Sequence, residues 1–467
     1  MNPQHFDVLV VGAGPGGYTA AIRAAQLGKS VAVVEEQYWG GVCLNIGCVP
    51  SKSLIYSAQL VQTFRNDAKE HGIQVEGEVS YDFQAAFQRS RSVADGRVKG
   101  IHYLMKKNGI TEFNARGTFT GPNSMELELA DGERQSATFD QAIIAVGAET
   151  RLLPGTALSD RVVTYKEQIL SSTLPKSIVI AGAGAIGVEF AYVMSSYGVK
   201  VTLVEFAERI VPLEDPDVSK ELTKRYRKLG IDIRTATAVT AVEEHADEVA
   251  VTLTKGETAE VVRAEKLLQA TGFTPRVTGY GLENTGVALT DRGAIAVDDQ
   301  MRTSVPHIYA IGDVTAKLML AHAAEAMALV AAEALADEPT HPLDYLMMPR
   351  ATYTNPQIAS FGFSENGTSP AGSEVKKTVF PFVANVKAHA VGEPGGFVKL
   401  LTDSRDGQLL GAHLIGPDVT ELLPELTLAR QEGLTVTQVA RNVHAHPTLS
   451  EAVKEALHGA AGQSINI

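Results

Sequence analysis

The chain has 467 residues, 45% of them hydrophobic and 20% charged, which is the composition of a folded globular protein. This length exceeds the size at which single hydrophobic cores stop growing, so we expect more than one domain. The net charge of −13 argues against a nucleic-acid partner, which would need a basic surface. No apolar run is long enough for a membrane span and no secretory signal pattern is visible, so we expect a cytoplasmic protein with no membrane partner.

The first predicted element is a strand that begins near Phe6 and runs into the glycine-rich turn Gly12-x-Gly14-x-x-Gly17. An alanine-rich helix follows, and then a second strand that ends at Glu35. In a dinucleotide-binding unit the first glycine permits a tight turn, the second lets the backbone approach a pyrophosphate, and the third allows close helix–strand packing. The helix N-terminus attracts the phosphates, and the acidic residue accepts hydrogen bonds from ribose hydroxyls.

The stretch YWGGVCLNIGCVPSKS, residues 38–53, holds both cysteines of the chain, Cys43 and Cys48. On a regular helix, residues five apart are separated by about 7.5 Å along the axis, beyond the ~6.8 Å Cα limit for a disulfide. A bond between the two therefore requires irregular backbone, with Cys43 in a loop or a distorted first turn. Glycines on either side supply that freedom, namely Gly40, Gly41 and Gly47.

Several roles for this cysteine pair can be weighed from its context. A structural disulfide is disfavoured in a reducing compartment, and a zinc site would need more ligands than two cysteines. Two unrelated buried cysteines remain an alternative. A strained disulfide held in a loop is a reducible one, so we favour a redox-active dithiol.

The glycine pattern returns later as Gly182-x-Gly184-x-x-Gly187, followed by Glu205. In both copies the acidic residue follows the first glycine by 23 positions. A simple glycine turn could explain one copy, but two copies in the same strand–turn–helix–strand context predict two dinucleotide sites. Electron transfer between two bound dinucleotides suggests a flavin and a nicotinamide, with the dithiol beside the flavin.

The remaining chain fits two such sites and a further domain. The stretch 303–313 predicts a buried strand that closes on Asp313, which could hold the polyol chain of FAD or could be a simple turn aspartate. Pro154 and Pro275 follow strand–glycine segments that look like crossings between domains. From about Leu346 the chain changes to strands rich in β-branched and aromatic residues, which indicates a third domain without a glycine fingerprint.

A candidate base lies near the C-terminus, in the stretch NVHAHPTLSEA. A dithiol needs a base, because the thiolate rather than the thiol attacks a disulfide. His444 and His446 are available, and Glu451 could orient the His446 ring and make its other nitrogen more basic. The alternative is that these histidines only cap or pack.

These motifs together resemble those of the flavoprotein disulfide reductases, and within that family they are similar to the branch that oxidises dihydrolipoamide in 2-oxoacid dehydrogenase complexes. The similarity runs from about residue 5 to residue 460. It implies an α/β fold with two Rossmann-like dinucleotide-binding domains and a C-terminal α+β dimerisation domain. The implied bounds are 1–150 with 277–345 for FAD, 151–276 for NAD and 346–467 for the interface.

The resemblance also assigns cofactor-binding residues, with Lys52 expected to pair with Glu189 near the flavin. The residues implied for FAD are Gly12, Gly14, Gly17, Glu35, Lys52, Gly117, Asp313 and Ala321. The residues implied for NAD are Gly182, Gly184, Gly187, Glu189, Glu205 and Gly272.

The resemblance implies a catalytic set of Cys43, Cys48, His446 and Glu451. His446 takes a proton from dihydrolipoamide, whose thiolate attacks Cys43, and Cys48 receives the electron pair and passes it through FAD to NAD+. Glu451 orients His446. The implied partners are the lipoyl domain of an E2 acyltransferase and a second copy of the chain, with each active site shared between subunits.

Two other kinds of flavoprotein are alternatives to this enzyme. Other disulfide reductases, of the glutathione or mycothione type, share the fold and the dithiol, but the NADPH-dependent ones favour arginines near the position of Glu205, whose carboxylate would repel a 2′-phosphate. A non-catalytic flavin redox sensor is expected to have lost a cysteine or the base, and this sequence retains them. We therefore predict an NAD-dependent enzyme.

Overall fold

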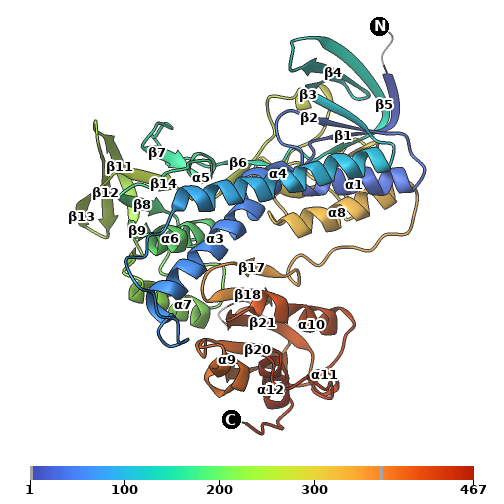
Figure 1. The fold of residues 1–467 in the computed structure, drawn as a ribbon. Coiled ribbons are helices and arrows are strands. Elements are labelled where there is room, and N and C mark those ends of the chain that lie inside the picture. The colour runs from blue at the N-terminus through green and yellow to red at the C-terminus, as the bar shows by residue number, and fades with distance from the viewer. Residues whose placement is uncertain (1–3, 366, 368–371, 467) are drawn as a thin grey trace. The chain divides into compact units, whose positions relative to one another are not determined.

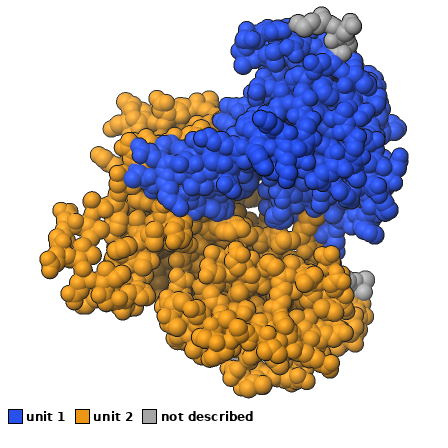
Figure 2. All heavy atoms as spheres, turned by 45° about the vertical axis from the view of Figure 1, so that its right-hand side comes forward, with its two compact units in different colours: residues 1–53, 85–151, 272–345 blue, residues 54–84, 152–271, 346–467 orange. Residues whose placement is uncertain are grey.

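The computed structural model describes residues 4–365, 367 and 372–466. The chain divides into two compact units, drawn in blue and orange in Figure 2. Unit 1 comprises residues 1–53, 85–151 and 272–345, and unit 2 comprises residues 54–84, 152–271 and 346–467. The bounds of the three predicted domains remain a prediction.

Unit 1 is built on a sheet whose parallel part has the strand order β3-β2-β1-β5-β16 (Figure 1). A further strand, β4, pairs antiparallel with both β3 and β5. The strands are β1 (Gln4–Val11), β2 (Val31–Glu35), β3 (Thr111–Gly121), β4 (Ser124–Leu129), β5 (Arg134–Ile144) and β16 (Ile308–Ala310), with a separate antiparallel pair, β6 (Ala148–Thr150) and β15 (Phe273–Pro275).

Unit 1 also contains helices, several of which pack against one face of this sheet. They are α1 (Pro15–Gln26), α2 (Gly41–Ile46) and α8 (Ala321–Ala334), with the short 3-10 turns η2 (Leu282–Asn284) and η3 (Gly312–Thr315). Two longer helices, α3 (Cys48–Gln62) and α4 (Phe83–Lys107), cross the boundary between the units in the chain, and α3 continues into a short π-helix, η1 (Thr63–Asp67).

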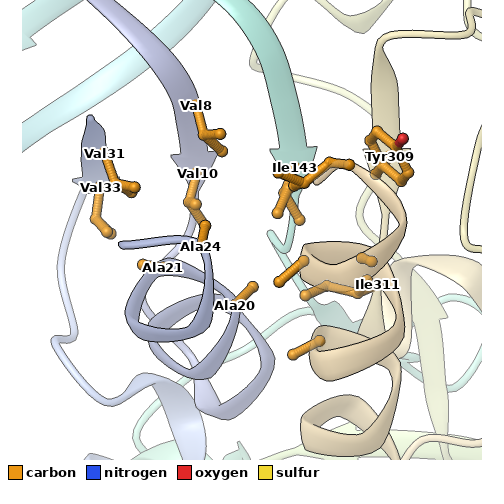
Figure 3. Close-up of a cluster of buried hydrophobic side chains, with 14 of the residues drawn as sticks. Val8, Val10, Ala20, Ala21, Ala24, Val31, Val33, Ile143, Tyr309 and Ile311 are labelled. Atoms are coloured by element: carbon orange, nitrogen blue, oxygen red, sulfur yellow. The ribbon is translucent and has the colours of Figure 1, made fainter. Parts of the chain in front are cut away.

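The C-terminal half of β1 is buried on both faces, which explains the uninterrupted apolar run of residues 8–11. Val8 and Val10 belong to the cluster formed with α1 and α8, where small alanines let the helices approach closely (Figure 3). Leu9 and Val11, which point the other way, pack in a second cluster with residues of β3, β4 and β5. The sheet is therefore a continuous core layer that holds the turn after β1 in place.

Unit 2 contains a second parallel sheet with the strand order β10-β9-β8-β14-β7. Its strands are β7 (Val162–Thr164), β8 (Ser177–Ala181), β9 (Lys200–Val204), β10 (Asp232–Arg234) and β14 (Lys266–Gln269), and its helices are α5 (Tyr165–Ile169), α6 (Ala185–Ser196) and α7 (Pro216–Lys228). A three-stranded antiparallel meander follows β10, made of β11 (Ala238–Glu244), β12 (Val249–Lys255) and β13 (Thr258–Ala264). The order repeats that of unit 1, with β8 in the place of β1.

The C-terminal part of unit 2 is an antiparallel sheet with the order β17-β18-β21-β20-β19. Its strands are β17 (Arg350–Thr352), β18 (Gln357–Gly362), β19 (Val375–Pro381), β20 (Phe397–Asp403) and β21 (Leu409–Gly416). Its helical segments are η4 (Phe382–Ala384), α9 (Val386–Ala390), α10 (Val419–Gln431), α11 (Val436–Val439) and α12 (Glu451–Ala460). One apolar cluster joins this sheet to α10, α11 and α12.

The predicted α/β fold class is thus confirmed, with two Rossmann-like parallel sheets and a C-terminal α+β region. Among the described residues, none of the helices combines the length and the apolar character that a membrane span requires.

Candidate active site

The first glycine of each predicted fingerprint occupies a turn that excludes any side chain. Gly12 has φ +102°, and a Cβ added there would lie 2.4 Å from Ala145 O. Gly182 has φ +101°, and its Cβ would lie 2.2 Å from Ala270 O. Each of these two residues has a left-handed backbone conformation, and a side chain on it would clash with a backbone carbonyl. Only glycine therefore fits at either turn.

The third glycine of each fingerprint lets the following helix pack onto the same turn. An added Cβ at Gly17 would lie 1.9 Å from Gly12 O, and one at Gly187 would lie 1.9 Å from Gly182 O. This is the packing role expected of the third glycine in a dinucleotide-binding fingerprint.

The second glycine of each fingerprint faces open space instead. The nearest atom to a Cβ at Gly14 is Gly41 Cα at 3.9 Å, and none lies within 4 Å at Gly184. These two residues are the N-caps of α1 and α6, and neither helix start has a side-chain cap. Open space beside uncapped N–H groups fits a bound pyrophosphate in each unit.

The acidic residues that end the second strands are held by backbone N–H groups. Glu35 accepts hydrogen bonds from the N–H groups of Ala13 at 2.8 Å and of Gln37 and Tyr38, both at 2.8 Å. This tethers the end of β2 to the turn after β1, and fixes the carboxylate where ribose hydroxyls are expected.

Glu205 repeats this arrangement in unit 2. It accepts hydrogen bonds from Ala183 N at 2.7 Å and from Ala207 N at 2.8 Å. Each oxygen retains lone pairs that a ribose hydroxyl can use. The Glu205 carboxylate is therefore held in place at the end of β9 by two backbone N–H groups.

Asp313 lies in η3 of unit 1, and burial raises the pKa of its carboxyl to about 6. Among the described residues, none donates a hydrogen bond to this carboxylate. A buried acceptor of this kind fits a hydroxyl-bearing ligand such as the polyol chain of FAD. Ala321 is the first residue of α8, whose start has no side-chain cap.

Two predicted glycines have other surroundings. An added Cβ at Gly117 would lie 2.5 Å from Met125 Sδ and 3.1 Å from Val34 Cγ1, so a side chain at this position of β3 would displace the Met125 side chain. Gly272 has φ +100° and its carbonyl accepts a hydrogen bond from Arg151 N at 2.9 Å. Their roles toward FAD and NAD remain proposals.

The two cysteines flank a break between helices. Cys43 is the third residue of α2 and Cys48 the first of α3, and between them Gly47 leaves helical geometry with φ −132° and ψ −117°. The backbone is irregular between the cysteines, and Cys43 lies in a distorted first turn as expected, because Gly41, the first residue of α2, has φ +66°. Neither cysteine forms a disulfide here; Cys43 is half-buried and Cys48 exposed.

The two thiols are electrostatically linked. A hydrogen bond with Cys48 and burial raise the pKa of Cys43, and the Lys52 ammonium opposes this rise. Lys52 lies four residues after Cys48 on α3, on the same helix face.

The cysteine segment is anchored by α4, which the sequence reasoning missed. Arg91 Nη2 donates to Asn45 O at the end of α2, and Arg89 Nη1 donates to Ser53 Oγ at 2.7 Å. The Asn45 side chain also donates to the carbonyl of Gly41 at 2.9 Å. No local signal marks these arginines, because charged residues on a long helix normally face solvent.

The candidate base and its carboxylate meet in unit 2. His446 Nδ1 lies 3.0 and 3.1 Å from the two oxygens of Glu451, the first residue of α12. Burial opposes it, but hydrogen bonds from Thr448 N and His446 lower the pKa of Glu451. The carboxylate therefore stays charged and fixes Nδ1 as the donor, while the largely exposed ring presents Nε2 outward.

The neighbouring histidine is a structural one. His444 is 5% exposed at its side chain, and its Nε2 lies 2.9 Å from Glu425 Oε2. His444 is buried against its carboxylate partner, whereas His446 is largely exposed. His446 is therefore the candidate base.

Glu189 is a buried residue of α6 that accepts a hydrogen bond from Tyr353 N at 2.9 Å. This fixes one of its oxygens within unit 2. Since Lys52 belongs to unit 1, the expected pairing of Lys52 with Glu189 remains a proposal.

The chain is similar to known proteins along almost its whole length. Residues 6–328 match the family model of pyridine nucleotide-disulphide oxidoreductases, and residues 348–457 match the dimerisation domain of the same family. The dihydrolipoyl dehydrogenase of Mycobacterium tuberculosis is 59% identical over 463 residues, and that of Corynebacterium glutamicum is 52% identical over 468, each covering 99% of both chains.

Solved structures agree with the fold. A crystal structure of LpdA from Mycobacterium tuberculosis has a TM-score of 0.90 at 26% identity, covering 98% of this chain and 99% of the other. A copper(II) complex of the flavoprotein disulfide reductase RclA from Escherichia coli has a TM-score of 0.87 at 25% identity, covering 98% of this chain and 99% of the other. The chain belongs to the pyridine nucleotide-disulphide oxidoreductases, whose cofactors here are FAD and NAD, and within them to the dihydrolipoyl dehydrogenases.

Proposed function

We propose that the protein oxidises protein-bound dihydrolipoamide to lipoamide and reduces NAD+ to NADH. The observation that carries this proposal is a chain related along its whole length to dihydrolipoyl dehydrogenases that retains both a cysteine pair and an oriented imidazole. A non-catalytic flavin sensor would have no need of an oriented imidazole.

The residues support the following course in the oxidised protein. Nε2 of His446 takes the proton of a substrate thiol, because Glu451 holds Nδ1 as a donor. The substrate thiolate attacks Cys43; its new S–S bond forms as the Cys43–Cys48 bond breaks, and the electron pair of that bond goes to Cys48. The second substrate thiol then displaces Cys43, which releases lipoamide as its own disulfide.

The cofactors would be held at the two fingerprints. In unit 1 the open side of Gly14, the fixed Glu35 and the buried Asp313 fit FAD. In unit 2 the open side of Gly184 and the fixed Glu205 fit NAD. Bound there, FAD supplies the redox relay between the dithiol and NAD+.

Two finer points belong to the same proposal. The chain carries the dimerisation domain of its family, and we propose a homodimer in which the cysteines of one subunit work with His446 of the other. We also propose that the substrate arrives on the lipoyl domain of an E2 acyltransferase of a 2-oxoacid dehydrogenase complex, in the cytoplasm.

The substrate and cofactor are tested together by steady-state kinetics. We expect dihydrolipoamide with NAD+ to give the highest kcat/KM, ahead of mycothiol, trypanothione or glutathione disulfides with NADH or NADPH. NADP+ should be at least about 100-fold poorer than NAD+, because like charges face each other at Glu205 at a cost of several kcal/mol. Faster reduction of one of the other disulfides, or equal use of both nucleotides, would contradict the proposal.

A further inference from the structure

The segment that carries His446 is largely exposed. Val443 is 91% exposed, the His446 side chain is 67% exposed, and Pro447 is also an exposed residue. The position of a general base matters, because a displacement of about 1 Å can lower the rate about 100-fold. The hydrogen bonds that hold this segment therefore determine whether the His446 ring reaches a substrate thiol.

Thr448 joins this segment to the carboxylate that orients the ring. Its N–H group donates to Glu451 Oε2 at 2.9 Å, and its hydroxyl donates to Ala445 O at 2.8 Å. Glu451 in turn holds His446 Nδ1. These bonds connect residues 445–451 with one another, but none of them ties the segment to the rest of unit 2.

Asn385, the N-cap of α9, supplies such a tie. Its Nδ2 group donates to Thr448 O at 3.1 Å, and its Oδ1 accepts from Ala388 N at 2.9 Å. The Ala388 N–H group requires an acceptor, so the Asn385 oxygen faces α9 and its NH2 group faces Thr448. Asn385 is only 4% exposed, which leaves little water to replace either bond.

The residues on either side of Asn385 belong to the core of the C-terminal part of unit 2. Phe382 and Ala388 are completely buried, in the apolar cluster that also contains residues of α12. Phe382 N donates to Gly396 O at 3.0 Å, and Asn385 N donates to Phe382 O at 2.9 Å. Asn385 is therefore a fixed point that can hold the Thr448 carbonyl.

We propose that Asn385 is a positioning residue that holds the Thr448 carbonyl, and through it the His446 imidazole, where the base reaches a substrate thiol. This inference rests on the proposed function. Glu451 sets the orientation of the ring within residues 445–451, whereas Asn385 sets the position of these residues on the C-terminal sheet. The two roles are separate, because the bond between His446 and Glu451 does not pass through Asn385.

The first test removes the tie and keeps the helix cap. Serine is a good N-cap residue, but its single, shorter polar group cannot serve both α9 and Thr448. In Asn385→Ser we expect kcat for oxidation of dihydrolipoamide to fall about 10- to 100-fold, while KM for NAD+ stays that of the parent. Oxidation of NADH by ferricyanide, which takes electrons from the flavin and needs neither thiol nor base, should stay within about twofold.

Two further variants separate hydrogen-bond donation from packing and from general loosening of the segment. Asn385→Asp keeps the shape and the cap of α9 but places an acceptor opposite the Thr448 carbonyl, so it should lose at least as much kcat as Asn385→Ser. The matched control is Asn442→Ser, because Asn442 Nδ2 donates to Glu425 Oε1 at 3.0 Å from the same segment but is exposed to water. Its kcat should stay within about twofold of the parent. Parent-like kcat in both Asn385 variants, or an equal loss in Asn442→Ser, would overturn the proposal.

The tie itself is measured without substrate, by hydrogen exchange and mass spectrometry on the FAD-loaded proteins. In Asn385→Ser the amides of residues 443–450 should exchange at least about tenfold faster than in the parent, while those of β21 keep the parent rate. Unchanged exchange in residues 443–450 would refute the tie. A parent protein that fails to oxidise dihydrolipoamide would instead contradict the proposed function and leave the exchange result standing.

Discussion

His446→Gln is expected to lower kcat/KM for dihydrolipoamide about 100- to 10,000-fold, the range of a lost general base. Glutamine can keep a hydrogen bond to Glu451 but cannot take a proton from the substrate thiol. The measurement is steady-state reduction of NAD+ by dihydrolipoamide, with FAD content checked so that the comparison is between equally loaded proteins.

The neighbouring histidine provides the control for this change. His444→Gln can still donate to Glu425, and we expect its kcat/KM to stay within a few-fold of the parent, since His444 is enclosed by its own partner. Glu451→Gln should lose activity less than His446→Gln, because it weakens the orientation of the ring without removing the base. Equal losses of kcat/KM in His444→Gln and His446→Gln would show that activity depends on the conformation of the segment that holds both histidines, and not on the His446 imidazole.

Lys399→Met is expected to destabilise the protein by about 3–5 kcal/mol, the cost of breaking a buried ion pair on one side. Lys399 Nζ is completely buried and donates to Asp215 at 2.7 Å, to Asp217 at 2.8 Å and to Glu365 at 2.5 Å. Asp215 is also completely buried and caps α7, so methionine would leave its carboxylate without the compensating charge. Thermal unfolding followed by circular dichroism measures the effect.

A second lysine of the same cluster gives the matched control. Lys377 donates to Glu365 at 2.8 Å but is 45% exposed, so Lys377→Met should cost less than about 1 kcal/mol. A Lys399→Met protein that unfolds at the same temperature as Lys377→Met would contradict the buried-cluster account.

The stability from this cluster has a defined pH window. Burial opposes it, but the hydrogen bond from Lys399 lowers the pKa of Asp215, and hydrogen bonds from Lys377 and Lys399 lower that of Glu365. Groups with lowered pKa stabilise the fold above their unfolded pKa and lose this contribution as the pH falls through the folded value. The difference between parent and Lys399→Met should therefore be full at neutral pH and shrink in acid.

The two dinucleotide units could be predicted because their signals are local. Each fingerprint lies within about thirty residues, and the positions of Gly12 and Gly182 are dictated by backbone that no other residue adopts. His446 and Glu451 are only five residues apart, so the sequence alone could predict that their side chains meet.

Other features could not be predicted because they depend on distant parts of the chain. Lys399, Asp215 and Glu365 look like surface charges in sequence, and only the packing of β20 against the start of α7 makes them a buried cluster. Helix α2 has no helical pattern of its own; the Asn45 side chain and Arg91 from α4 hold its end. Contacts between residues so far apart in the chain leave no periodic pattern in the amino-acid sequence.

We propose that Cys43 and Cys48 of one subunit share an active site with His446 of the other subunit. Cys43→Ser and His446→Gln should each be inactive alone, because thiol and base act as a unit. In a two-fold dimer made of one subunit of each kind, one site carries both lesions and the other carries neither.

The deciding measurement is therefore the lipoamide activity of the two variants unfolded, mixed and refolded together, with hybrid dimers verified by differently tagged subunits. Isolated hybrids are expected to regain about half of the parent activity. Hybrids that form but remain inactive would show that His446 serves the cysteines of its own chain, and would contradict the shared site.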